Sequence, residues 1–323
     1  MEDTPAAVSA VARLQGAATG DRIFRTLLTI AALAIPTLLG FLVYELWTGS
    51  RPAIAKFGVD FLATSTWDPV AEKFGALPLI LGTLLSSLIA LVIAVPLSIG
   101  VAIFLTEFAP GPIRRPVAFV VELLAAIPSV VYGLWGIFFL IPVLRATLFP
   151  FLQDTLGFLP LFRGTIYGNS MLAAGIILAI MIMPYIMSVT REVLATVPGS
   201  QREAALALGA TRWEAAWTAV VPYARSGIVG AIILGLGRAL GETMAVTMLI
   251  GNRHEIVASL FAPGYTMAAA IANEFTEAQT DMHFAALAYV ALALFSVTVL
   301  VNALARLLIW KVSKGRASGG AGL

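Results

Sequence analysis

Two charged residues stand inside a long apolar stretch in the C-terminal third of the chain. Residues 227–250 are long enough to cross a bilayer as a helix, which takes about 20 residues, yet they contain Arg238 and Glu242. A charge near the bilayer centre costs at least about 2.5–3.5 kcal/mol, so such side chains face protein or water. Because the two residues are four apart, they are expected to share one helix face and to be able to pair.

Two interpretations of this pair are open. The charges either line a path for a solute or only neutralise each other inside the protein. We favour the first, because ionisable residues inside spans usually mark pathways. Gly237 and Gly241 are also four residues apart, and small residues at that spacing let a second helix approach closely. The sequence therefore predicts a charged position beside a tight helix–helix contact.

The segment before this stretch, residues 191–226, is polar and has the signals of two short helices. Ser200 and Thr211 each precede a glutamate by three residues, which is the pattern of a capping box. Gly209 is expected to end the first helix in the left-handed conformation, and Pro222 to end the second. Such a knob between two spans suits docking into a groove on a partner. The alternative is a capped hairpin that only links two spans.

The composition is that of an integral membrane protein. Of the 323 residues, 59% are hydrophobic and 12% are charged, whereas about 25% of a soluble domain is charged. None of the apolar runs shows the alternation of an outer-membrane barrel, and in lipid the backbone must bond to itself, so each run is expected to be a helix. The six runs cover residues 24–47, 78–106, 117–143, 170–190, 227–250 and 283–310.

The basic residues predict how these spans are oriented. Of the 20 lysines and arginines, thirteen fall in the termini and the even-numbered loops, six fall in the odd-numbered loops, and Arg238 lies within a span. Cytoplasmic segments carry the excess of positive charge, so both termini and the polar segment are expected in the cytoplasm. The chain has no cysteine and a net charge of +2. Thiolate metal sites are therefore excluded, and neither a cofactor nor nucleic acid binding is indicated.

Three stretches carry a resemblance to a known family. Glu203-Ala204-Ala205, followed after three residues by Gly209 and after twelve more by Pro222, resembles the "EAA" loop of ABC importer permeases. The runs GRALGETMA, around Arg238, and ELLAAIPSVVYGLWG, which contains Ser129, resemble the permease subunits of phosphate-specific ABC importers. The long first external loop is similar to that of the PstC-type subunit.

The resemblance implies an all-α type I ABC importer permease fold with a cytoplasmic coupling helix. It assigns Glu203, Ala204, Ala205 and Gly209 to coupling with an ATPase. It also implies a substrate pathway, for which the sequence offers Arg238, Glu242, Thr243 and Ser129.

The resemblance further divides the chain into segments. These are a cytoplasmic tail (1–22), the first span with its external loop (23–74), the permease domain (75–311) and a flexible cytoplasmic tail (312–323). The implied partners are a homologous second permease subunit forming a heterodimer, two ATP-binding subunits, a periplasmic or lipid-anchored phosphate-binding protein, and membrane lipid. The expected location is the bacterial cell membrane.

The chemistry of the charged pair is compatible with phosphate. Arg238 offers a planar fork of donors that fits phosphate oxygens, and an ionised Glu242 can accept a hydrogen bond from a phosphate that still carries a proton. Sulfate at neutral pH has no such proton. Two alternatives remain: a permease for another oxyanion, such as sulfate, molybdate or phosphonate, and a transporter or channel driven by an ion gradient. The chain has no G-x-x-x-x-G-K-[ST] loop, so ATP hydrolysis is expected in a partner.

Overall fold

The computed structural model describes residues 5–317, and the side chains of residues 21–307. Six helical stretches within these residues are long and apolar enough to cross a membrane. This confirms the predicted all-α membrane class with six spans. The spans cover Asp21–Leu62, Leu77–Phe108, Ser129–Leu156, Met171–Ala195, Arg212–Gly241 and Asp281–Leu307.

Most elements follow one another directly or after a few residues, and the longest connections are residues 63–76 and 251–266. The first part of the chain forms α1 (Pro5–Phe57), η1 (Gly58–Leu62), α2 (Leu77–Ile103), η2 (Phe104–Phe108), α3 (Gly111–Ala126), α4 (Ser129–Trp135), η3 (Gly136–Leu140), α5 (Ile141–Ala146), α6 (Leu148–Leu156) and η4 (Pro160–Phe162). The second part forms α7 (Met171–Ala195), α8 (Gly199–Ala207), α9 (Arg212–Ala215), η5 (Ala216–Val220), α10 (Val221–Gly241), α11 (Met244–Ile250), α12 (Met267–Glu274) and α13 (Asp281–Ala317).

Helix α7 is the centre of the bundle. It packs against α2, α3, α10 and α11, and its apolar side chains are the most thoroughly buried of any span. Helices approach closely in a membrane where one of them offers a small residue. Gly227 of α10 meets Val193 of α7, and Gly235 of α10 meets Ile186. The predicted pair, Gly237 and Gly241, makes no such close helix contact within the described chain, because nothing lies within 4 Å of a Cβ built at either position.

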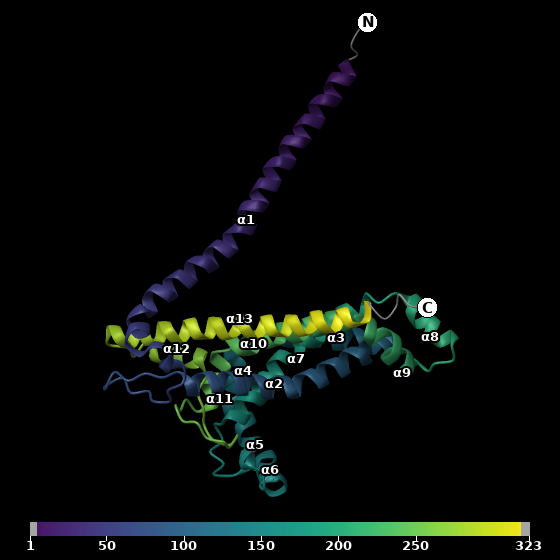
Figure 1. Ribbon diagram of the computed structural model, residues 1–323. Coiled ribbons are helices and arrows are strands. Elements are labelled where there is room, and N and C mark those ends of the chain that lie inside the picture. Colours follow the sequence, from purple (N-terminus) through teal and green to yellow (C-terminus); the bar gives the residue numbers. More distant parts are fainter. Residues whose placement is uncertain (1–4, 318–323) are drawn as a thin grey trace.

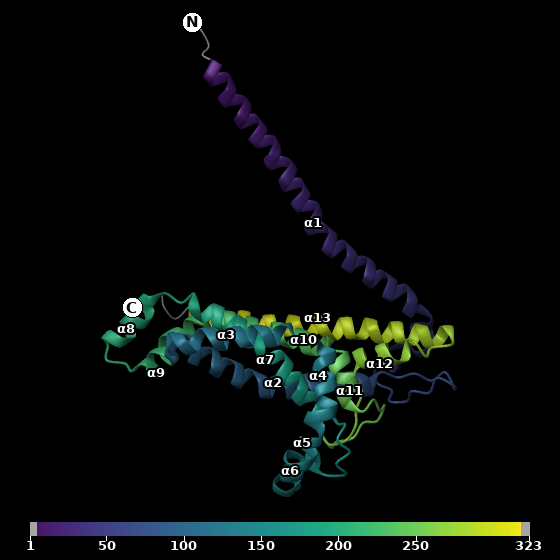
Figure 2. The same cartoon turned by 180° about the vertical axis from the view of Figure 1, so that it is seen from behind.

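The two ends of the bundle differ in character. Helices α8 and α9 lie at one end and α12 at the other (Figure 1). The last turns of α1 pack along α13 at the α12 end, and the N-terminal part of α1 projects away from the bundle in both views (Figures 1 and 2). Helix α1 begins at Pro5, so most of the predicted N-terminal tail is helical. Likewise α13 continues to Ala317, and residues 318–323 of the predicted C-terminal tail lie outside the described residues.

The third predicted run, residues 117–143, is not one helix. Ile127 and Pro128 have extended backbone angles (ψ 130° and 141°) and separate α3 from α4. Pro128 has no N–H with which to bond the carbonyl of Leu124, and its ring disfavours a helix at the residue before it. The freed carbonyls find other donors, since the hydroxyl of Tyr132 donates to Leu124 and that of Tyr185 donates to Ala125.

The fifth predicted run, residues 227–250, is broken as well. Helix α10 ends at Gly241, Glu242 is extended (ψ 127°), and α11 starts at Met244. The N-terminal boundary also differs from the prediction: Pro222 does not end a helix, because η5 runs directly into α10. Pro222 instead lies just after η5, a π-helical turn, inside the continuous helix Arg212–Gly241.

Candidate functional site

Arg238 lies in the last turn of α10 and rests on an aromatic ring. Its guanidinium carbon is 4.2 Å from the centroid of the Tyr185 ring on α7, which is a cation–π arrangement. Its Nε atom is buried and has no hydrogen-bond partner. Among residues 21–307, no carboxylate oxygen lies within 4.0 Å of this guanidinium. Arg238 is therefore held in place by Tyr185, while its charge and donors remain available.

Glu242 does not pair with Arg238, because among the described side chains no carboxylate oxygen lies within 4.0 Å of the guanidinium. Helix α10 ends one residue before Glu242, and the extended ψ of Glu242 redirects the chain that follows it. The Glu242 carboxylate instead accepts a long hydrogen bond of 3.4 Å from the N–H of Ala245, in the first turn of α11. Negative charge is favourable at the start of a helix.

The two helix breaks lie beside each other. A Cβ at Gly133 of α4 would lie 3.3 Å from the Cα of Ala245 on α11, and one at Gly136 would meet the side chain of Leu249. The later residue of the third span contacts the later residue of α11. This part of the third span and α11 therefore run in the same direction. If the same pairing is extended toward the N-terminal ends of the two helices, Ser129 lies level with Glu242.

The other predicted pathway residues fall at the same level. Ser129 is the first residue of α4 and is half-buried. Thr243 lies in the second break, where its hydroxyl donates to the carbonyl of Gly241 over 3.3 Å. Tyr185 joins the two breaks, because its hydroxyl donates 2.7 Å to Ala125 next to the first break and its ring supports Arg238. The structure thus brings four predicted residues into one region and adds Tyr185, which the sequence analysis did not single out.

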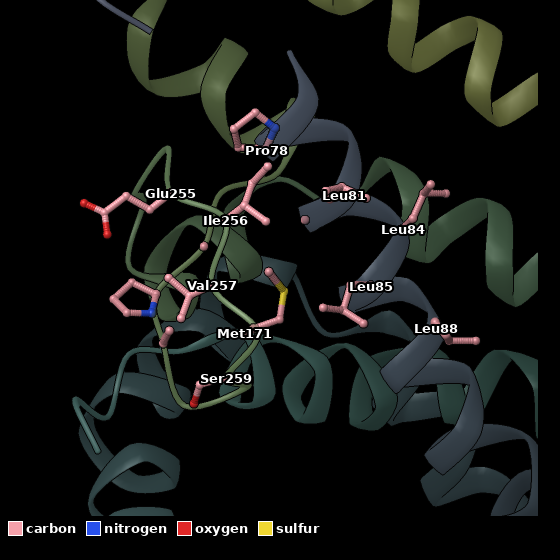
Figure 3. Close-up of a pocket in the computed structure, with 14 residues that line it drawn as sticks. Pro78, Leu81, Leu84, Leu85, Leu88, Met171, Glu255, Ile256, Val257 and Ser259 are labelled. Carbon is pink, nitrogen blue, oxygen red and sulfur yellow. The ribbon is translucent and has the colours of Figure 1, made fainter. Parts of the chain in front are cut away.

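A separate apolar pocket lies beside the N-terminal part of α2 and carries different chemistry. Its volume is about 310 Å³. Figure 3 shows leucines of α2 on one side, Ile256 and Val257 on the other, and Met171 between them. The one charged residue in its lining is Glu255. An anion would find no cationic partner here, so this pocket is not the site to which Arg238 belongs.

The predicted coupling residues form an exposed helix at the α8 end of the bundle. Glu203 and Ala204 are exposed and Ala205 is half-buried, and α8 has no buried residue. Gly209 follows with φ of +89°, which confirms the predicted left-handed ending. Leu208, an apolar residue, is 91% exposed.

One of the two predicted capping boxes is present. The Thr211 hydroxyl accepts from the N–H of Glu214 (3.3 Å), and the Glu214 carboxylate accepts from the N–H of Thr211 (2.7 Å). The other is wrong: α8 begins at Gly199 after Pro198, so Ser200 lies inside the helix and no side chain caps it. The proline already fixes the chain for helix entry, which leaves the serine unused.

The opposite end holds a cluster that the sequence analysis missed. The Trp-His-Glu cluster consists of Trp67, His254, Glu274 and His283. The Glu274 carboxylate accepts from the indole N–H of Trp67 (2.6 Å) and lies 3.1 Å from Nε2 of His283 and 3.3 Å from Nε2 of His254. The two histidines come from well-separated positions in the sequence. Among the described residues, no group of three His, Cys, Asp or Glu side chains is arranged to hold a metal ion.

Burial governs the ionisation of this cluster. It lowers the pKa of His254 from 6.5 to about 4 and raises the pKa of Glu274 above its usual 4.5, because a charged group is poorly solvated there. The hydrogen bonds from Trp67 and His283 oppose the shift of Glu274 without cancelling it. His254 is therefore neutral at pH 7.

Solved structures show the same fold. A chain of a bacterial alginate ABC transporter, crystallised with its alginate-bound periplasmic protein, superposes with a TM-score of 0.59 over 88% of this chain and 95% of its own, at 16% identity. A chain of the MetNI methionine ABC transporter in an inward-facing conformation superposes with a TM-score of 0.50 over 74% of this chain and 94% of its own, at 18% identity.

Sequence relatives are much closer. The phosphate transport system permease protein PstC of Mesorhizobium japonicum is 49% identical over 90% of both chains. Those of Xylella fastidiosa and Haemophilus influenzae are 48% and 46% identical over more than 90% of each chain. Residues 94–314 match the model of the family described as "Binding-protein-dependent transport system inner membrane component". The chain therefore belongs to the family of binding-protein-dependent inner-membrane transport components, among permease proteins of the PstC type.

Proposed function

We propose that this chain is a membrane-spanning permease subunit of an ATP-driven importer and provides part of the path for inorganic phosphate. It is a transport component rather than an enzyme. Its relatives carry the name of the phosphate transport system permease, and its six apolar helices make it a multi-pass membrane protein.

The observation that carries the phosphate path is the state of Arg238. A guanidinium inside a span is costly, and it is retained where it serves a path or a pair. No carboxylate neutralises it within the described side chains, and its buried Nε has no partner. The separation of Glu242 from Arg238 therefore supports the pathway interpretation over mutual neutralisation. A planar fork of donors matches the oxygens of phosphate.

Glu242 gives the path a means of selection. Its carboxylate makes one long hydrogen bond, which leaves further acceptor sites for a phosphate that still carries a proton. A sulfate ion has no proton to donate and would meet an unpaired negative charge, which disfavours it. Ser129, at the level of the helix breaks, adds a hydroxyl group that can donate to a phosphate oxygen, and the Thr243 hydroxyl can do so if it releases its 3.3 Å bond to the carbonyl of Gly241.

The remaining parts of the proposal concern assembly. The chain pairs with a homologous second permease, and two ATP-binding subunits engage α8 from the cytoplasm. A phosphate-binding protein delivers the anion from outside. The orientation, with both termini and α8 in the cytoplasm, rests on the excess of basic residues in those segments.

Uptake of radiolabelled phosphate into vesicles that hold the assembled transporter tests this function. Arg238→Lys should lose most uptake, because an ammonium cannot reproduce the two-pronged contact. Arg225→Lys, at the other end of the same helix, is the matched control and should transport normally. Normal uptake by Arg238→Lys would contradict the role of the guanidinium.

The second arm of the test concerns selection. Glu242→Gln should reduce phosphate uptake and weaken the rejection of sulfate in competition assays. Unchanged phosphate transport with unchanged rejection of sulfate would remove the proposed role of Glu242. Wild-type uptake that prefers sulfate, molybdate or phosphonate would assign another oxyanion. Uptake that persists without the ATPase subunits would point to a gradient-driven carrier.

A further inference from the structure

The structure assigns a positioning role to Arg202, the residue directly before the Glu203-Ala204-Ala205 motif. We infer that its side chain clamps the coupling helix α8 to the cytoplasmic ends of α2 and α7, so that movement of α8 is passed to both spans. This inference rests on the proposed coupling to an ATPase.

The guanidinium of Arg202 uses its donors on two neighbouring elements. Its Nε–H and one Nη–H donate to the two oxygens of Glu107, over 2.9 and 2.8 Å, as a bidentate pair. Other Nη–H groups donate to the carbonyls of Val197 (2.8 Å) and Leu194 (3.1 Å). The hydrogen bond to Glu107 raises the pKa of Arg202 above its ordinary value, so the guanidinium remains charged.

Each contact is one that its element needs. Helix α7 ends at Ala195, and the last four carbonyls of a helix have no partner within it. Leu194 supplies one of them, and Val197 follows in the turn that leads to α8. Glu107 lies in η2, a π-helical turn at the end of the second span, and 10% of its side chain is exposed. Removing the partner of so buried a carboxylate leaves an uncompensated charge.

The elements joined by Arg202 also share one packed core. Leu105 of η2, Leu194 at the end of α7 and Val220 of η5 belong to the same buried cluster. Helix α8 itself contributes no buried residue and projects at the end of the bundle (Figure 1). Helix α8 packs on η5 and α9 through half-buried side chains, and the Arg202 clamp adds a direct charged link from α8 to the second span.

A second ion pair at the same end makes a matched control. Arg191 of α7 and Glu122 of α3 are 2.8 Å apart, and 54% of the Glu122 side chain is exposed. This pair has similar chemistry and is cytoplasmic by the predicted orientation, but it does not touch α8. Exposed pairs contribute little, so loss of Glu122 should leave coupling unchanged.

The experiment measures phosphate imported per ATP hydrolysed, with the complete transporter and its binding protein in proteoliposomes. Arg202→Lys keeps the charge but not the bidentate and carbonyl contacts, and Glu107→Gln keeps the shape but not the charge. Both should assemble, yet lower the ratio by at least about five-fold, the lower end of typical coupling between sites. Glu122→Gln should keep the wild-type ratio. A purely structural role would reduce the amount of assembled complex and leave the ratio unchanged, which would overturn the inference.

A chemical rescue gives an independent measurement. The chain has no cysteine, so Glu107→Cys with Arg202→Cys introduces two thiols into an otherwise thiol-free chain. Joining them with a short bis-maleimide in a complex whose other subunits lack reactive thiols should restore the ratio. Failure of the spacer to restore it would contradict the clamp. A wild-type transporter whose ATP hydrolysis did not respond to phosphate would instead overturn the proposed function.

Discussion

At the scale of single residues, Tyr185 determines how Arg238 presents its charge. Its ring lies 4.2 Å below the guanidinium, and its hydroxyl donates to Ala125 beside the first helix break. Tyr185 therefore connects the guanidinium of Arg238 on α10 with the carbonyl of Ala125 at the end of α3. The two functions of Tyr185 can be separated, because phenylalanine keeps the ring and removes the hydroxyl.

We expect Tyr185→Phe to retain much of the phosphate uptake and Tyr185→Leu to lose most of it. The phenylalanine variant leaves the Ala125 carbonyl without its donor, a cost of about 1–3 kcal/mol that falls on stability. The leucine variant also removes the support of Arg238, worth about 0.5–2 kcal/mol. Thermal unfolding of both variants and uptake at several phosphate concentrations distinguish these effects. Equal uptake by the two variants would show that the ring does not position Arg238.

The sequence identifies Arg238 and Glu242 but not their surroundings. Both stand out because charge is costly inside a span, and that signal needs no structure. The helix end at Gly241, between the two residues, is concealed by the continuous apolar pattern from 227 to 250. Tyr185 could not be found either, since a lone tyrosine in an apolar run has many ordinary roles. What was missing is the knowledge of which helices are neighbours.

At the scale of elements, helix α10 carries two glycines whose surroundings differ. A Cβ at Gly235 would lie 2.6 Å from the Ile186 side chain of α7, whereas one at Gly237 would meet nothing within 4 Å. Close approach of α10 to the central helix thus depends on Gly235. The open face at Gly237 is available to a second subunit.

Gly235→Leu should destabilise the isolated subunit, whereas Gly237→Leu should not. An added side chain in a packed interface typically costs about 1–3 kcal/mol, and the open face at Gly237 has room for it. Thermal unfolding in detergent, one variant beside the other, provides the comparison. Similar unfolding temperatures for the two variants would contradict the packing of α10 on α7 at this position.

The sequence predicts the positions of the membrane spans more reliably than the breaks within them. All six apolar runs correspond to spans, because bilayer thickness and backbone hydrogen bonding leave few alternatives. The break at Pro128 has a local cause that the sequence displays. The break at Glu242 has no proline, and Gly241 alone does not distinguish a helix end from a packing position. Ser200 shows that a local pattern can also predict a feature that does not form. Its capping pattern is present in the sequence, but α8 starts at Gly199 after Pro198, so Ser200 does not cap the helix.

At the scale of the whole molecule, the Trp-His-Glu cluster gathers distant segments of the chain. Trp67 comes from the loop between η1 and α2, His254 from the loop between α11 and α12, Glu274 from α12 and His283 from the start of α13. The rings of Trp67 and His254 stack at 5.1 Å, and both contact the same carboxylate. No local sequence pattern predicts such a convergence, because it depends on the path of the entire chain.

We expect the stability of this end of the molecule against local opening to depend on pH. The pKa of His254 is about 4 when buried and about 6.5 when exposed. Between these values the open form binds a proton that the closed form does not. His254 therefore contributes stability that is complete above about pH 6.5 and is lost as the pH falls toward 4. The raised pKa of Glu274 acts in the opposite direction, because acidification favours its protonated, buried form.

Hydrogen exchange of the α12 amides, corrected for intrinsic rates, measures this opening. Between pH 7 and pH 5 the opposing contributions of His254 and Glu274 partly cancel in the wild type, with His283 and Glu277 also facing the carboxylate. His254→Gln removes one contribution, so α12 should become better protected as the pH falls. The difference in the free energy of opening between the wild type and the variant gives the contribution of His254. One titrating group can change this free energy by no more than about 1.4 kcal/mol per pH unit. Parallel pH profiles for the two proteins would mean that His254 remains neutral whether this end is open or closed. The dependence on pH would then have to come from Glu274 and its acidic neighbour alone.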